Sequence, residues 1–112
     1  MSRREQMSIG ELTVGTDGDA VSLLASFTAS VTPVAAATIK AEEQDLTIPG
    51  VKVGDIVVAF KAPTAFYALN VGVGGMRVSA ADTVSVKFVN PTAGSVTPSA
   101  GDWTFTVLRP AA

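Results

Sequence analysis

Apolar residues occupy every second position over long stretches of this chain. The clearest example is Ala20–Thr32, where one set of alternate residues is apolar and the other is rich in hydroxyl groups. A helix would scatter the two sets around its circumference, whereas a strand places them on opposite faces. We therefore predict that Ala20–Thr32 is a strand with one apolar and one hydroxyl-rich face, and that it forms a hairpin with Met7–Val14 across the turn-forming residues 15–19.

Further short alternating segments follow, separated by Pro, Gly, Asn and Asp. The predicted strands are Thr38–Ile48, Ile56–Lys61, Phe66–Val71, Met76–Ser79, Thr83–Val89 and Trp103–Arg109. Strands at intervals of about 8–12 residues are typical of a sandwich or jelly roll. We therefore predict an all-β fold: a single β-sandwich or jelly-roll-like domain with an N-terminal arm.

Particular strands carry more detailed predictions. Ile56–Lys61 is apolar on both faces, which favours a central strand, and Glu42-Glu43 is a plausible place for a bulge. Residues 1–37 are interpreted as the N-terminal arm and hairpin, and residues 38–112 as the β-sandwich domain. The residues predicted to form the core are Trp103, Phe88, Val86, Ile56 and Val58.

Composition narrows the function classes. The 112 residues suffice for one domain; 47% are hydrophobic and only 16% are charged, below the usual quarter. Such a low charge density suggests that another subunit covers part of the surface. No basic run follows Arg3-Arg4, and no apolar stretch approaches the ~20 residues of a membrane span. Nucleic acid and membrane are therefore not expected partners, and we read the N-terminus as cytosolic and not as a signal peptide.

The chain offers little for catalysis or metal binding. It has no histidine to activate a serine and no cysteine for a disulfide or a zinc site. The acidic cluster Glu42, Glu43 and Asp45 alternates between two strand faces, which favours a solvated edge strand over an acid–base pair. Asp17-Gly18-Asp19 lacks the Glu that would complete a calcium loop. We expect no enzyme activity, no catalytic residues, no cofactor and no metal.

Several remaining residues are interpreted structurally. The glycines of residues 72–75 precede a strand pattern instead of a helix, so they indicate a bulge or corner and not a phosphate site. Asp55 and Asp82 stand at strand entries, where a carboxylate accepts backbone N–H groups, and Arg77 is a possible partner for either. Trp103 is more typical of a core than of a sugar-binding platform.

The second part of the chain resembles a small β-domain of tailed-bacteriophage structural proteins. The resemblance covers Thr38–Arg109, about two-thirds of the chain. The matching residues are Pro49-Gly50, Val53-Gly54-Asp55, Arg77-Val78-Ser79-Ala80, Asp82-Thr83-Val84, Phe88, Asn90, Thr92 and Val107–Arg109. Among phage proteins of this size, head decoration (cement) proteins fit best, so the resemblance implies a virion protein on the capsid exterior, made in the host cytoplasm.

The same resemblance implies the partners. These are the major capsid protein and further copies of the chain, as a homotrimer. We place the contact in the N-terminal arm, which mixes charged and apolar anchors: Arg3, Arg4, Met7, Ile9 and Leu12. An alternative with the same fold is a receptor- or carbohydrate-binding β-module of a phage head or tail fibre.

Overall fold

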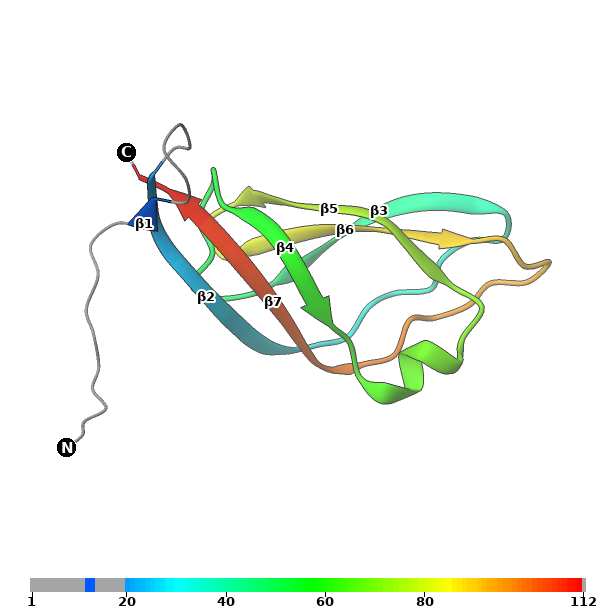
Figure 1. Ribbon diagram of the computed structural model, residues 1–112. Helices are drawn as coiled ribbons and strands as arrows, with labels where there is room; N and C mark the ends of the chain where they lie inside the picture. The colour runs from blue at the N-terminus through cyan, green and yellow to red at the C-terminus, as the bar shows by residue number, and fades with distance from the viewer. Residues whose placement is uncertain (1–11, 14–19, 112) are drawn as a thin grey trace.

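The protein is a sandwich of two antiparallel sheets, seen in a computed structural model that describes residues 12–13 and 20–111 (Figure 1). The first sheet has the order β1-β2-β7-β4, with bounds β1 (Leu12–Thr13), β2 (Ala20–Val31), β7 (Gly101–Pro110) and β4 (Ile56–Lys61). The second has the order β3-β6-β5, with bounds β3 (Lys40–Thr47), β6 (Thr83–Asn90) and β5 (Gly72–Ala80). The predicted all-β sandwich is confirmed.

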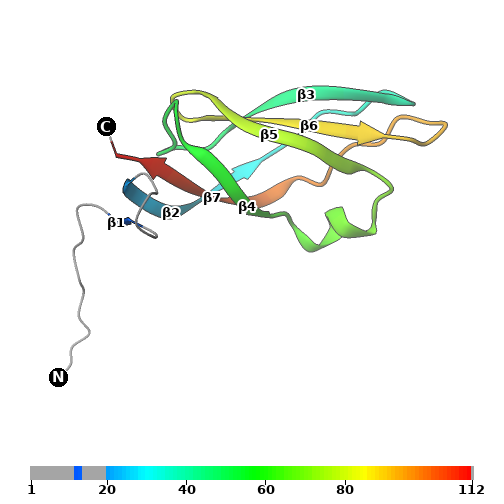
Figure 2. The ribbon, with the colours of Figure 1, turned by 45° about the horizontal axis from the view of Figure 1, so that its top comes forward.

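The two sheets face each other across an apolar core, and the turned view shows them as separate layers (Figure 2). Alternation in β7 puts Trp103, Phe105 and Val107 inside, and all three are fully buried. Trp103 meets Phe66 and Phe88 edge to face, with ring centroids 5.0 and 5.8 Å apart. Such pairs stabilise a core beyond the burial of their area alone.

The N-terminal third of the chain contributes to this same sandwich. β2 pairs with β7 from Val21 to Val31, in regular register after one shift near its start. Residues 20–31 are thus continuous with the sheet built by residues after 37. The predicted hairpin partner of β2 is present in part, as the two-residue strand β1 opposite Ala20 and Val21.

Two predictions about the middle of the chain are wrong. β4 lies at the edge of its sheet and not at the centre, so Ile56 and Val58 are each 52% exposed and not in the core. Its outward residues have no second layer to cover them. Phe66–Val71 is not a strand: Thr64–Ala68 forms the 3₁₀ helix η1, which directs Phe66 into the core. Alternation over so few residues does not separate a strand from a single helical turn.

The irregularities of the second sheet are partly as predicted. The register between β5 and β6 shifts between Val73 and Gly75, which confirms a bulge among the glycines. A side chain at Gly74 would begin 2.9 Å from Val89 Cγ2, so this position requires a glycine-sized residue. β3 pairs with β6 in unbroken register, so the bulge predicted at Glu42-Glu43 is absent.

Candidate contact surface

The outer face of the β1-β2-β7-β4 sheet combines apolar and hydroxyl side chains. The pairing registers of β2 and β4 with β7 arrange these residues in rows across three strands. The first row is Leu24, Leu108 and Ile56; the second is Ser26, Thr106 and Ala59; the third is Thr28, Thr104 and Lys61. Lys61 contributes the one charge in these three rows, so most of this face is uncharged.

The first row is an exposed apolar strip. Leu24 is 60% exposed and Ile56 is 52% exposed, with the half-buried Leu108 between them. Val58, at the register shift in β4, adds a further exposed side chain. Exposed apolar side chains that gather on one face are typical of a protein–protein contact, whereas isolated ones need no explanation.

The second and third rows are held by hydroxyl groups that bond to each other. Ser26 Oγ lies 2.7 Å from Thr106 Oγ1, and Thr28 Oγ1 lies 2.7 Å from Thr104 Oγ1. Pairs of this kind lock neighbouring strands together through side chains as well as backbone. The hydroxyl-rich face predicted for Ala20–Thr32 is therefore confirmed, and it is bonded to β7.

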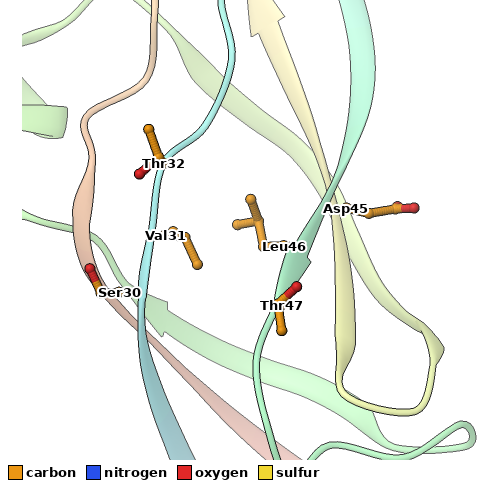
Figure 3. A pocket seen from close by; sticks show the side chains of 6 residues that line it. All are labelled: Ser30, Val31, Thr32, Asp45, Leu46 and Thr47. Atoms are coloured by element: carbon orange, nitrogen blue, oxygen red, sulfur yellow. The ribbon is translucent and has the colours of Figure 1, made fainter.

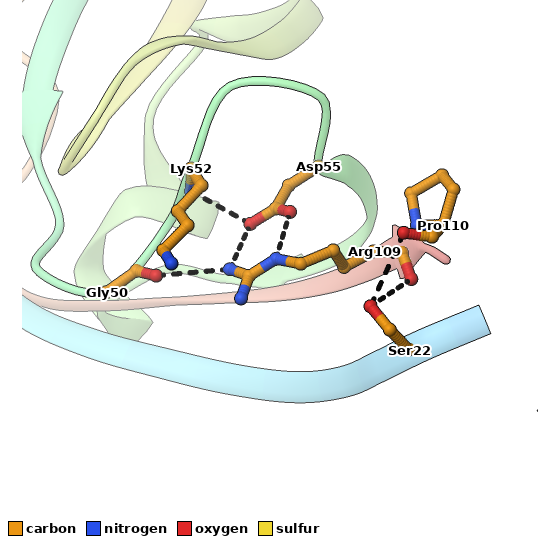
Figure 4. A network of polar contacts seen from close by, with 6 residues as sticks. All are labelled: Ser22, Gly50, Lys52, Asp55, Arg109 and Pro110. Carbon is orange, nitrogen blue, oxygen red and sulfur yellow. Dashed lines mark hydrogen bonds and ion pairs between the residues drawn. The ribbon is translucent and has the colours of Figure 1, made fainter. Parts of the chain in front are cut away.

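A buried ion pair fixes one end of this sheet (Figure 4). The side chain of Asp55, at the entry of β4, is fully buried, and Arg109 of β7 donates to it from Nε at 2.6 Å and from Nη2 at 2.8 Å. The backbone N–H of Lys52 donates to the same carboxylate at 2.9 Å. Arg109 Nη2 also donates to the Gly50 carbonyl at 3.3 Å. The pair thus ties the β3–β4 connection to the last strand.

These contacts shift both ionisation equilibria towards the charged pair. The hydrogen bonds from Arg109 lower the pKa of Asp55; burial opposes this, and the Lys52 N–H reinforces it. The pKa of Arg109 is raised, chiefly by the hydrogen bonds to Asp55. As predicted, Asp55 accepts a backbone N–H at a strand entry; Asp82 does the same, from Gly50 N at 2.8 Å.

The acidic residues of β3 do not converge, as predicted for an edge strand. Arg77 pairs with Glu43 at 3.0 Å on the exposed face of the second sheet, so its predicted pairing with Asp55 or Asp82 is wrong. The hydrogen bonds from Arg77 lower the pKa of Glu43, and burial opposes this shift. Asp45 instead accepts a hydrogen bond from Ser85 Oγ at 2.5 Å. These contacts are structural and bring no two carboxylates together.

An open groove of about 250 Å³ lies where β2 and β3 approach each other at one side of the sandwich (Figure 3). Val31 and Leu46 point towards each other across it, while Asp45 points away. Both apolar side chains are buried, and the remaining lining residues are Ser30, Thr32 and Thr47. The one acidic residue of its lining, Asp45, points away from the groove and accepts a hydrogen bond from Ser85.

The structure leaves the predicted contact residues of the arm largely untested. Arg3, Arg4, Met7 and Ile9 lie outside the described residues, as does the Asp17–Asp19 turn. Leu12 lies in β1, opposite Val21. Sequence analysis missed the exposed apolar row, although Leu24 was visible as the one apolar residue on the hydroxyl face.

Among residues 12–13 and 20–111, no group of three or more potential metal ligands comes together. Within the same residues, no helix has the length and apolar character needed to cross a membrane. No protein-family model, curated protein or solved structure matches this chain.

Proposed function

We propose that this protein is a phage capsid decoration (cement) protein that binds the outer surface of the head and stabilises it. The observation that carries the proposal is the largely uncharged outer face of the β1-β2-β7-β4 sheet, with its exposed row Leu24, Leu108 and Ile56. An apolar strip beside neutral hydroxyl groups suits contact with another protein, because covering these residues does not bury a charged group. The motif resemblance to phage virion domains supplies the class of partner, the major capsid protein.

The outer sheet face and the N-terminal arm act together in this proposal. β1 joins the arm to the edge of the same sheet that carries the apolar row. In this proposal the arm residues Arg3, Met7 and Ile9 contact the capsid or a neighbouring copy beside Leu24. A homotrimer at a threefold position of the shell provides several such attachments at once, which raises the overall affinity through effective concentration.

The alternative, a carbohydrate- or receptor-binding module, has less support. Sugar platforms use exposed aromatic rings, and the sole tryptophan, Trp103, is fully buried in the core. Tyr67 is 60% exposed, but its hydroxyl already accepts the N–H of Ala62 at 3.0 Å. A single tyrosine on a short helix makes a poor platform.

The proposal is tested by adding purified protein to undecorated heads of the phage that encodes it and measuring co-sedimentation. Leu24→Lys and Ile56→Lys should each weaken binding at least about tenfold, since each places a charge in the contact. The matched control is Val34→Lys, at a 67% exposed apolar residue in the β2–β3 connection, which should bind as the wild type does. Unchanged binding by both face variants, or no binding of the wild type, would refute the proposal.

A further inference from the structure

Within the described residues, β3, β5 and β4 lie at sheet edges and β2 is covered by β1 over only two residues; the first three carry features that discourage pairing with another strand. β3 has Lys40, Glu42 and Glu43, and β5 is interrupted by register shifts. β4 is only six residues long, contains a register shift and ends at Lys61. Charges, bulges and short length are the usual means by which an exposed edge avoids unwanted pairing.

From Leu23 to Val31 the outward edge of β2 has none of these features, and its one register shift lies before this stretch, between Val21 and Leu23. β1 covers it only at Ala20 and Val21, and within the described residues no strand pairs with the edge from Ser22 to Val31. Those ten residues contain no charge, proline or glycine, and their pairing with β7 is regular from Leu23 onwards. About five of them direct their backbone N–H and C=O groups to this edge. Such an edge is a ready acceptor for another strand.

We propose that the outward edge of β2 is the docking site for residues 2–11 of the same chain, which extend β1 along it. The two pairs between β1 and β2 set the register: Leu12 lies opposite Val21, and Thr13 lies opposite Ala20. In each pair the two residue numbers add up to 33. Continued without a break, this register places Glu11 opposite Ser22 and Ser2 opposite Val31. In this register residues 2–11 therefore pair with the unpaired edge over its full length, from Ser22 to Val31.

The composition of residues 2–11 fits this place. They contain no proline, and Arg3, Arg4, Glu5 and Glu11 supply the charges that β2 lacks. A strand added here becomes the new outermost strand, and these charges then protect it from further pairing. Docking in the same chain is favoured over exchange between chains, because β1 joins the segment to the site without a loop to close.

The same register assigns side chains to faces. Directly opposite residues of an antiparallel pair share a face, so Ile9 lies with Leu24, and Met7 lies with Ser26, on the outer side of the sheet. The apolar row thereby lengthens to four strands: Ile9, Leu24, Leu108 and Ile56. On the inner side, Ser8 shares a face with Ala25, and Arg4 shares a face with Ala29. This arrangement does not depend on capsid binding.

Engineered disulfides in the full chain test the register, since the natural sequence has no cysteine. Opposite pairs alternate between wider and narrower spacing, so two pairs are used: Met7→Cys with Ser26→Cys, and Ser8→Cys with Ala25→Cys. The control is Met7→Cys with Ser30→Cys, four residues out of register. We expect at least one opposite pair to form an intramolecular disulfide about tenfold faster than the control. Equal rates, or a covalent dimer, would overturn docking within the chain.

Amide hydrogen exchange gives an independent readout in the unmodified protein. If residues 2–11 are paired, amides on both edges of β2 are protected over Ser22–Val31, and deletion of residues 2–9 speeds exchange at alternate residues by at least about tenfold. Exchange of alternate β2 amides at the rate of loop amides in the full chain would overturn the proposal. That outcome is decisive even where the deletion variant does not fold.

Discussion

Replacing Asp55 with alanine is expected to destabilise the protein by about 3–5 kcal/mol, the usual effect of removing one partner from a buried ion pair. The side chain of Asp55 is fully buried and that of Arg109 is 24% exposed, so the remaining guanidinium is only partly rehydrated. Alanine also removes the acceptor for the Lys52 N–H. For a domain with about 5–15 kcal/mol of stability, this loss is a large fraction.

Urea unfolding monitored by the fluorescence of Trp103 measures this loss, because Trp103 is the sole tryptophan and is fully buried. The matched control is Arg77→Ala, which breaks the exposed pair with Glu43 and should leave the midpoint almost unchanged. An Asp55→Ala midpoint as close to the wild type as that of the control would refute the reasoning.

The pH dependence of the same pair provides a second check with a defined sign. Because the folded-state pKa of Asp55 is lowered, the folded protein binds fewer protons than the unfolded chain in acid. The contribution of Asp55 to the free energy of unfolding is therefore fully present above the pKa of the unfolded chain, about 3.9. This contribution is lost as the pH falls through the pKa of Asp55 in the folded protein. The stability difference between wild type and Asp55→Asn should be largest near neutral pH and shrink below about pH 4; a constant difference would contradict this.

Three further outcomes are expected from stability and binding measurements. Phe88→Ala should cost about 3–5 kcal/mol in urea unfolding, because the fully buried ring leaves a cavity; a wild-type midpoint would contradict its place in the core. Gly50→Ala should lower the melting temperature of the protein, because φ is +109° there and the new Cβ would lie 2.4 Å from Phe27 Cε1. The control in the same thermal melt is Gly72→Ala, where no atom lies within 4 Å of the new Cβ. Asn90→Ala should lower the melting temperature by several degrees, because the buried amide donates to two carbonyls; no change would imply that water replaces it.

The sequence predicted the all-β sandwich because alternation is the direct signature of a pleated strand with one buried face. It also placed Trp103, Phe88 and Val86 in the core correctly. The prediction that Ile56 and Val58 lie in the core was wrong, because a strand that is apolar on both faces is compatible with two structures. Such a strand is either buried on both sides or carries an exposed apolar surface. Only the layering of the sheets, which leaves the outer face of β4 without a covering layer, decides between them.

The candidate site was less accessible from the sequence for a similar reason. The row Leu24, Leu108 and Ile56 joins residues from three distant segments, and their alignment depends on register across β7. The partner of Asp55 was missed because Arg109 lies 54 residues away, whereas Arg77 was a nearer candidate. Local patterns report which face a residue occupies, and they carry no information on which distant residue stands beside it.

The paired hydroxyl groups on the outer face also determine how adaptable that face is. In each pair, Ser26 with Thr106 and Thr28 with Thr104, either oxygen can be the donor. One hydroxyl proton of each pair lies between the two oxygens, and the other is free to turn outwards. Reversing a pair moves the outward proton from one strand to its neighbour without moving any heavy atom. The same rigid surface can thus meet partners whose acceptors stand at slightly different positions.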